Sequence, residues 1–192
     1  MASNPKKLFT PEEYLESERQ SEYKSEYLDG EIFAMAGASE AHILIEANVI
    51  AEFNVQFQKK PCQVYTGNMK IDLSKHGMYA YPDAVVVCGD PIYSDKYKDN
   101  LLNPLLIVEI LSPSTEAYDR GEKFFRYRKL ETFKEYLLIS QHTPHIDHYF
   151  KQETNKWILS ESDGLQDTLK LPTLEITLSL SRIYEKVKFD QA

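Results

Sequence analysis

Short apolar runs separated by turn residues make up much of the chain, and most are too short to form helices. The segments 62–74, 79–89 and 104–112 are rich in β-branched and aromatic residues and end at glycine or polar positions. This pattern is typical of strands. Asp29-Gly30 lies between two further apolar pairs, Tyr27-Leu28 and Ile32-Phe33. A turn pair in that setting predicts a β-hairpin.

Other segments carry signals for helices. Thr10, Pro11 and Glu13 form the pattern of a capping box with proline at the first helical position. Ser39 precedes the longest predicted helix, in which the apolar residues follow helical spacing at positions 43, 47, 50, 53 and 57. A third helix is expected after Ser114 or Thr115.

The predicted order is helix, hairpin, helix, three strands, helix and further strands. It indicates an α+β (α/β mixed sheet) fold with a central mixed β-sheet flanked by helices. At 192 residues, without repeats or linkers, the chain is expected to form one domain over 1–192, with its core at about 9–184.

Composition limits the setting of the protein. No run approaches the roughly 18 apolar residues of a membrane span, and no apolar segment of a secretory signal follows the N-terminal lysines. Cys62 and Cys88, the two cysteines, offer neither a disulfide framework nor zinc-ligand spacing. We therefore expect a reducing cytoplasm and no membrane partner.

Charge gives a mixed indication about nucleic acid. The net charge of −8 argues against it, because affinity for phosphates comes largely from lysine and arginine. Residues 118–134, however, hold six basic side chains and three acidic ones. A solvated helix face would explain this run equally well.

Two carboxylates interrupt apolar strands. Glu109 lies within the run from Leu105 to Leu111, and Asp83 follows Pro82 where its strand enters the sheet. Counting by twos places each carboxylate on a definite face, so pairing of the two strands in a suitable register would bring both to one spot. At 4 Å they would repel by roughly 4 kcal/mol at an effective dielectric of 20. A raised pKa, a basic partner or a divalent cation would relieve this, and a structural salt bridge is the simpler alternative.

These residues resemble a known family. Pro82-Asp83 followed by Glu109 on a second apolar strand resembles the core of PD-(D/E)xK nucleases. The stretches "EYLDGEIFAMAG", "AHILI", "YPDAVVV", "LLIVEILSPST", "DRGEKFFRYRKL" and "EYLLI" together resemble the Uma-two family, from about Phe9 to Tyr184. The resemblance implies a restriction endonuclease-like fold, divalent-metal-dependent phosphodiester hydrolysis and a cytoplasmic setting.

The resemblance also implies roles for individual residues. Asp83 and Glu109 match the two acidic ligands of the metal, Mg²⁺ or Mn²⁺. Leu111 stands where the wider nuclease signature has a lysine. Lys123, on the following helix one turn before Tyr127, is the leading replacement, and Lys70 is the second candidate. An exposed helix lysine is the simpler interpretation of Lys123.

Two accessory residues are further candidates for the site. The resemblance carries over Glu31 as a further acidic residue, although a solvated hairpin position would explain it equally well. His42, in the first turn of the long helix, faces the same cleft or only caps that helix. His142, His145 and His148 do not predict zinc, because residues three apart in a strand point to opposite faces and no cysteine is nearby.

The sequence thus predicts a metal-dependent DNA endonuclease with Asp83, Glu109, Lys123, Glu31 and His42 in its site. A homodimer would accompany two-fold symmetric cutting of DNA. The alternative is a nuclease-fold protein that binds nucleic acid or a protein partner without cutting, which the net charge and Leu111 favour.

Overall fold

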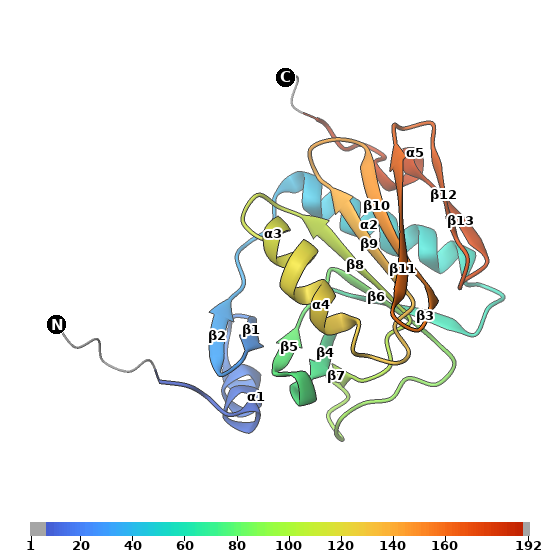
Figure 1. Cartoon of the computed structure of the whole chain (residues 1–192). Helices are drawn as coiled ribbons and strands as arrows, with labels where there is room; N and C mark the ends of the chain where they lie inside the picture. The colour runs from blue at the N-terminus through green and yellow to red at the C-terminus, as the bar shows by residue number, and fades with distance from the viewer. Residues whose placement is uncertain (1–6, 190–192) are drawn as a thin grey trace.

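Two mixed β-sheets form the centre of the protein in a computed structural model that describes residues 7–189 (Figure 1). The five-stranded sheet has the order β2 (Glu31–Ala34), β1 (Ser25–Leu28), β5 (Met78–Ala80), β4 (Lys70–Leu73) and β7 (Asn100–Leu101). The six-stranded sheet has the order β11 (Lys156–Asp163), β10 (His145–Glu153), β9 (Glu135–Ser140), β8 (Leu106–Leu111), β6 (Ala84–Cys88) and β3 (Cys62–Thr66). Strands β8 and β9 are parallel, as are β4 and β7, which makes both sheets mixed.

The helices and a small hairpin cover these sheets. They are α1 (Pro11–Gln20), α2 (Glu40–Gln56), the 3₁₀ turn η1 (Ser74–His76), α3 (Glu116–Tyr118), the π-helical turn η2 (Asp119–Lys123), α4 (Phe124–Tyr127), α5 (Leu180–Ile183), and the hairpin of β12 (Thr168–Leu171) and β13 (Ile176–Ser179). The α+β fold class predicted from the sequence is confirmed. None of the helices over residues 7–189 is long and apolar enough to cross a membrane.

Of the three predicted helix starts, those at Thr10 and Ser39 have the expected side-chain caps, while α3 begins after Thr115 without one. The Thr10 side chain accepts a hydrogen bond from the Glu13 backbone N–H, and the Glu13 carboxylate accepts one from the Thr10 N–H. The Ser39 side chain accepts from the His42 N–H at the start of α2. These local contacts satisfy backbone groups that a helix end leaves unpaired, which is why the sequence signals them reliably.

The central strands β6, β8 and β9 of the six-stranded sheet are buried on both faces. Helix α2, the β12–β13 hairpin and α5 contribute to the hydrophobic core on one face. The helical segment α3–η2–α4 and the five-stranded sheet contribute to the core on the other. In Figure 1 this segment, drawn in yellow, lies between the β1–β2 hairpin and the larger sheet. The helical segment thus packs between the two sheets, and the candidate site lies along it.

One predicted strand is divided. The segment 79–89 reads as a single strand, but β5 belongs to the five-stranded sheet and β6 to the six-stranded sheet. The chain crosses between the sheets over Tyr81–Asp83, where Pro82 has no N–H to continue a ladder. The expected single central sheet is therefore two sheets, and Asp83 lies at their junction.

The expectation of no disulfide framework is wrong for the one cysteine pair. Cys62 and Cys88 are directly opposite each other in the antiparallel pair β3–β6 and form a disulfide, with their Cα atoms 3.9 Å apart. The pairing depends on strand register, which the spacing of two cysteines does not reveal.

Candidate active site

Strand register brings the two predicted carboxylates together. Strands β6 and β8 are antiparallel with Ala84 opposite Val108, so one further step places Asp83 opposite Glu109. The Ile110 N–H donates a hydrogen bond to Asp83 Oδ2 at 2.6 Å, which fixes Asp83 against β8. Glu109 shares the face of β8 that packs toward α4, as the alternation of side chains requires.

Lys123 meets Glu109 from the helical segment. Its Nζ atom is 3.2 Å from Glu109 Oε1, 3.2 Å from Glu26 Oε1 and 3.1 Å from Asp119 Oδ1. Asp119 and Lys123 are the first and last residues of the π-helical turn, and both are buried. Such turns occur frequently at functional sites. We call the three carboxylates around Lys123 (Glu26, Glu109 and Asp119), together with Asp83 opposite Glu109, the acidic cluster.

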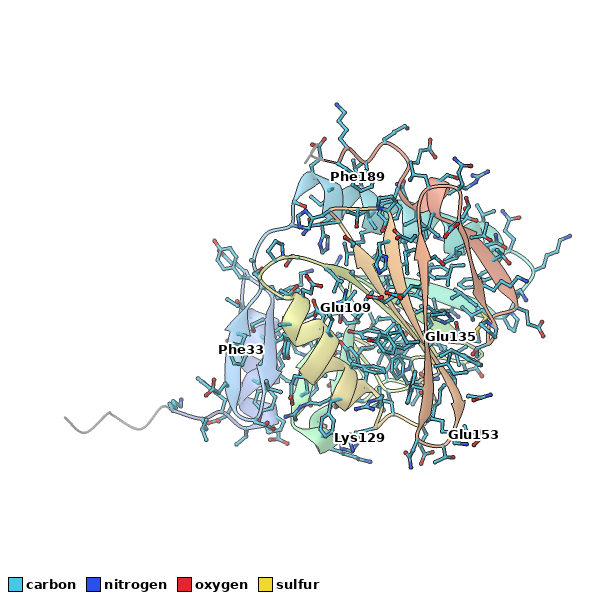
Figure 2. All side chains as sticks on the ribbon, turned by 45° about the horizontal axis from the view of Figure 1, so that its top comes forward. Phe33, Glu109, Lys129, Glu135, Glu153 and Phe189 are labelled. Carbon is cyan, nitrogen blue, oxygen red and sulfur yellow. A yellow bond between two sulfur atoms is a disulfide. The ribbon has the colours of Figure 1, made fainter. Side chains whose placement is uncertain are left out.

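The acidic cluster is largely enclosed. Glu109 is 3% exposed and Lys123 5%, and Figure 2 shows Glu109 between the yellow helical segment and the strands of the larger sheet. Tyr127 donates a hydrogen bond from its hydroxyl to Glu109 Oε1 at 3.0 Å. Tyr136 donates to the Asp119 carbonyl oxygen at 3.0 Å. Two buried tyrosines therefore hold the carboxylate and the π-helical turn in place.

Sequence reasoning missed Glu26 and Asp119. The sequence could have predicted Asp119, because Asp119, Lys123 and Tyr127 are spaced four residues apart and so share one helix face. Glu26 has almost none: it is a single carboxylate in a short strand, and its burial depends on how the hairpin packs on the helical segment. Glu26 Oε1 also accepts a hydrogen bond from the Tyr81 N–H at 2.9 Å, which ties it to the junction between the sheets.

His42 forms the more accessible edge of the site. Its Nε2 atom lies 2.9 Å from Asp83 Oδ1, and the two side chains are 14% and 18% exposed. Helix α2 places it there, with Ser39 bonded both to the His42 N–H and to the buried Gln141 after β9. His42 therefore does more than begin the helix, because it contacts a predicted metal ligand directly.

Burial and neighbouring charges shift the pKa of several groups. Burial raises the pKa of Glu109 well above its usual value, and the nearby carboxylates add to this, although Lys123 opposes it. Burial lowers the pKa of Lys123, but Glu109, Glu26 and Asp119 outweigh that effect and hold it well above normal. Burial likewise lowers the pKa of His42, while the bond to Asp83 and the surrounding carboxylates raise it overall. Each shift favours the protonated form.

The charges of the site do not balance. Four carboxylates and one ammonium group leave a formal charge of −3 when His42 is neutral, and −2 when Glu109 is also protonated. Glu109 uses Oε1 for both Lys123 and Tyr127, and Glu26 uses Oε1 for both Lys123 and the Tyr81 N–H. A cluster of oxygen donors with surplus negative charge suits a hard divalent cation.

The remaining candidates lie elsewhere or at the margin. Lys70 is buried, but its Nζ pairs with Glu18 Oε2 at 2.7 Å. Lys123 is thus the candidate lysine that lies in the acidic cluster. Glu31 lies on β2 opposite Leu28, two cross-strand pairs nearer the turn than Glu26. The hairpin carboxylate in contact with Lys123 is therefore Glu26.

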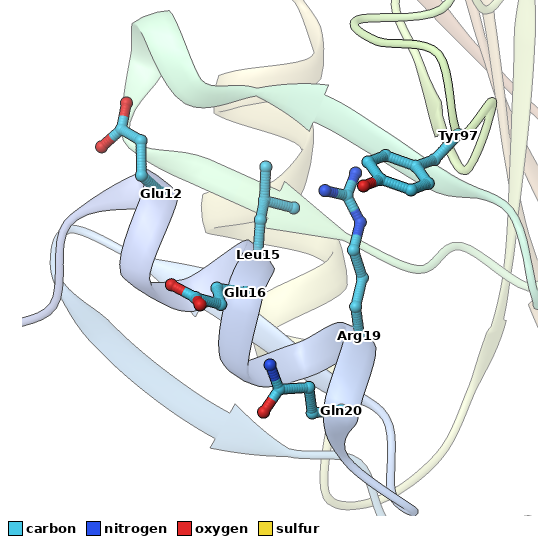
Figure 3. A pocket seen from close by; sticks show the side chains of 6 residues that line it. All are labelled: Glu12, Leu15, Glu16, Arg19, Gln20 and Tyr97. Atoms are coloured by element: carbon cyan, nitrogen blue, oxygen red, sulfur yellow. The ribbon is translucent and has the colours of Figure 1, made fainter.

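A surface hollow lies apart from this chemistry. It has a volume of about 540 Å³ and is lined by Glu12, Leu15, Glu16, Arg19, Gln20 and Tyr97 (Figure 3). Asp95 and Asp99 bind the Arg19 guanidinium, which also lies 4.3 Å from the centre of the Tyr97 ring. Its arginine is already paired, and none of its lining residues belongs to the acidic cluster.

Comparison with known proteins identifies the family. Residues 11–182 match the model of the Uma2 family, described as "Putative restriction endonuclease". The chain belongs to the Uma2 family. It is 35% identical to "Uncharacterized protein slr1290" of Synechocystis over 97% of both chains. It is 32% identical to "Uncharacterized protein sll1609" of the same organism, over 88% of this chain and 96% of that one.

A solved structure shares the fold of this Uma2 protein. The crystal structure of a "putative nuclease belonging to DUF820" from Anabaena variabilis matches with a TM-score of 0.75, covering 92% of this chain and 97% of that one. The two sequences are 17% identical, so this likeness bears on the fold alone. The resemblance to the Uma-two family drawn from the sequence is confirmed, and the Uma2 protein has the fold of its structural neighbour.

Proposed function

We propose that this Uma2 protein is a divalent-metal-dependent endonuclease that hydrolyses phosphodiester bonds in DNA, with Asp83 and Glu109 as ligands of Mg²⁺ or Mn²⁺. The observation that carries the proposal is the surplus of carboxylates around Lys123. Membership of a family described as restriction endonucleases supports nucleic acid as the substrate. Strands β6 and β8 and the yellow helical segment lie around the proposed site (Figure 1).

The surplus negative charge explains why a cation is needed. A phosphodiester is an anion, and at 4 Å two unit charges of like sign repel by about 4 kcal/mol at an effective dielectric of 20. A divalent ion bound by Asp83 and Glu109 would neutralise this repulsion, polarise a phosphoryl oxygen and activate water.

The chain's own residues would orient that chemistry. Lys123 holds Glu109 in place and keeps a positive charge near the position of the phosphate, a general role of positioned cations. Tyr127, one turn further along the same helix face, donates a hydrogen bond to the same carboxylate oxygen. His42, hydrogen-bonded to Asp83 at the accessible edge, is placed to accept or return a proton. Glu31, on the same hairpin face as Glu26, remains an accessory candidate.

The setting of the reaction is also a proposal. The family description supports DNA as the polymer, and cutting both strands of a two-fold symmetric target would suggest a homodimer. A cytoplasmic location remains the expectation from the sequence.

Cleavage of supercoiled plasmid tests the proposal. Purified protein is incubated with Mg²⁺, Mn²⁺ or EDTA, alongside Glu109→Gln and the matched control Glu18→Gln. Both glutamates pair with a buried lysine, but only Glu109 belongs to the acidic cluster. We expect metal-dependent nicking by the wild type and by Glu18→Gln, and none by Glu109→Gln. Undiminished nicking by Glu109→Gln would contradict the proposal.

A second function has one observation in its favour. Both oxygens of Asp83 are already hydrogen-bonded. Oδ2 accepts from the Ile110 N–H, and Oδ1 is bonded to His42 Nε2. A protein that binds nucleic acid without cutting would retain such a closed arrangement. Saturable DNA binding by the wild type, with no cleavage under either metal, would favour this reading.

A further inference from the structure

Side chains of two paired strands converge at the β10–β11 edge of the larger sheet, two strands from Glu109. In the antiparallel pair β10–β11, His145 is opposite Asp163 and Asp147 is opposite Glu161. Residues two apart on a strand share a face, and so do directly opposed residues. All four therefore project from the same side of the sheet. We propose that His145, Asp147 and Glu161 form a second metal site, which takes a four-coordinate ion of the Zn²⁺ class.

The donor atoms have suitable spacing for such an ion. His145 Nε2 is 3.2 Å from Asp147 Oδ1 and 3.8 Å from Glu161 Oε1, and the three donor atoms lie within 4.8 Å of one another. Ligands bound at 2.0–2.2 Å in a tetrahedron are about 3.3–3.6 Å apart. Glu161 is the most exposed of the three, with 63% of its side chain accessible, so a small rotation can bring its carboxylate closer.

The second ring nitrogen of His145 gives an independent indication. Its Nδ1 atom faces Asp163 Oδ1 at 3.7 Å, while Nε2 faces the two proposed ligands. Histidines that bind metals commonly direct the other ring nitrogen to a carboxylate, which fixes the tautomer and the ring orientation. The four side chains reproduce that arrangement.

Neighbouring residues hold two of the proposed ligands, Asp147 and His145, in position. Asp147 is buried and uses Oδ1 toward His145, while Oδ2 pairs with Arg120. A carboxylate held in this way keeps one oxygen directed at the metal position. The backbone of His145 is fixed by the buried Tyr184, whose hydroxyl accepts from the His145 N–H at 3.1 Å and donates to its carbonyl at 2.8 Å.

The chemistry of the donors selects the class of metal. One imidazole nitrogen with two carboxylates suits Zn²⁺ and similar transition ions better than Mg²⁺, which prefers oxygen ligands and water. The site does not need the other histidines. His142 is exposed in the turn before β10, and the buried His148 pairs with Glu135 at 2.8 Å. The three histidines do not converge; His145 is joined by carboxylates of β10 and β11 instead.

Titration with Co²⁺ tests the proposal, because four-coordinate Co²⁺ absorbs visible light much more strongly than six-coordinate Co²⁺. The full chain, without a histidine tag, is compared with His145→Ala, Glu161→Gln and Asp163→Asn. His142→Ala is the matched control, since it removes an exposed histidine three residues away. Thermal unfolding of each variant checks that it folds.

We expect one equivalent of Co²⁺ to give intense bands that Zn²⁺ abolishes. His145→Ala should remove the bands, Glu161→Gln should weaken binding at least 10-fold, and Asp163→Asn should weaken it about 10-fold. His142→Ala and Glu109→Gln should leave them unchanged, so the outcome is independent of the proposed nuclease site. Absence of the bands in the wild type, or their persistence in folded His145→Ala, would overturn the inference.

Discussion

Two buried lysines of this protein have opposite charge surroundings. Lys70 is 1% exposed and lies between the rings of Tyr14 and Tyr81, at 5.2 and 5.3 Å from their centres. It pairs with the single carboxylate of Glu18, whose other oxygen accepts a hydrogen bond from the Tyr81 hydroxyl at 2.5 Å. The positive charge of Lys70 is therefore balanced by the one negative charge of Glu18.

Lys123 is buried to a similar degree but is outnumbered. Three carboxylates contact its ammonium group, and Asp83 lies opposite one of them across the strands. Burial does not distinguish the two lysines, since both side chains are almost fully buried. The number of carboxylates does distinguish them. A single ion pair is electrically balanced, whereas extra buried carboxylates must be protonated or bind a cation.

Removing the lysine should have the largest effect. Lys123→Met leaves Glu26, Glu109 and Asp119 buried without their cation, and we expect a loss of about 3–5 kcal/mol in the free energy of unfolding. Urea denaturation at pH 7 in EDTA measures it. A loss below about 1 kcal/mol would show that the three carboxylates are not charged together in the folded protein.

The balanced pair should respond differently to neutralisation. Lys70→Met alone should also destabilise, but Lys70→Met combined with Glu18→Gln should recover most of the loss, because no unpaired charge remains. Lys123→Met combined with Glu109→Gln should recover less, since Glu26 and Asp119 stay unpaired. Equal recovery in the two double variants would remove the distinction between the sites.

Glu109→Gln should change how stability depends on pH. The pKa of Glu109 is raised on folding, so its contribution is complete below its ordinary value of 4.5 and is lost as pH rises through the folded value. Glutamine has no proton to lose. Without metal, the variant should therefore gain stability relative to the wild type between pH 5 and 8, by about 1.4 kcal/mol per unit of pKa shift. A constant difference across this range would contradict the raised pKa.

Metal should stabilise only the unbalanced site. At ten times its Kd, Mg²⁺ should raise the free energy of unfolding by about 1.4 kcal/mol, or about 3–5 °C in Tm. The same addition to Glu109→Gln should have little effect. Thermal scans with and without EDTA compare the two proteins, and an equal shift in both would place the ion elsewhere.

The smallest expected effect concerns His42. Its pKa is raised overall in the folded protein, so its stabilising contribution is present below 6.5 and is lost as pH rises through the folded value. His42→Gln should therefore cost more stability at pH 5.5 than at pH 8.5, by about 1 kcal/mol or less. His142→Gln, which removes an exposed histidine outside the acidic cluster, is the control variant.

Local rules predicted part of this structure well. The caps at Thr10 and Ser39 and the Asp29-Gly30 turn depend on neighbouring residues, and all three are present. The meeting of Asp83 and Glu109 follows from the two-residue period of strands once β6 and β8 pair. Family membership could be recognised from the motifs that surround these residues.

Features that depend on long-range packing were not predictable. Glu26 reaches Lys123 because the β1–β2 hairpin packs on the helical segment, a contact between residues 97 positions apart. The division of the 79–89 segment arises because Pro82 lies where the chain passes from one sheet to the other. The Cys62–Cys88 disulfide depends on register between β3 and β6. None of these leaves a pattern within one element.

Calorimetric titration with Mg²⁺ tests the central claim, that the surplus of acid around Lys123 is a cation site. The proteins are the wild type, Glu109→Gln and Glu18→Gln, each also carrying His145→Ala so that the proposed second site does not contribute. The account predicts one bound ion in the first and third proteins and at least 10-fold weaker binding in Glu109→Gln. Equal affinity in all three proteins, or no binding by the wild-type site, would contradict it.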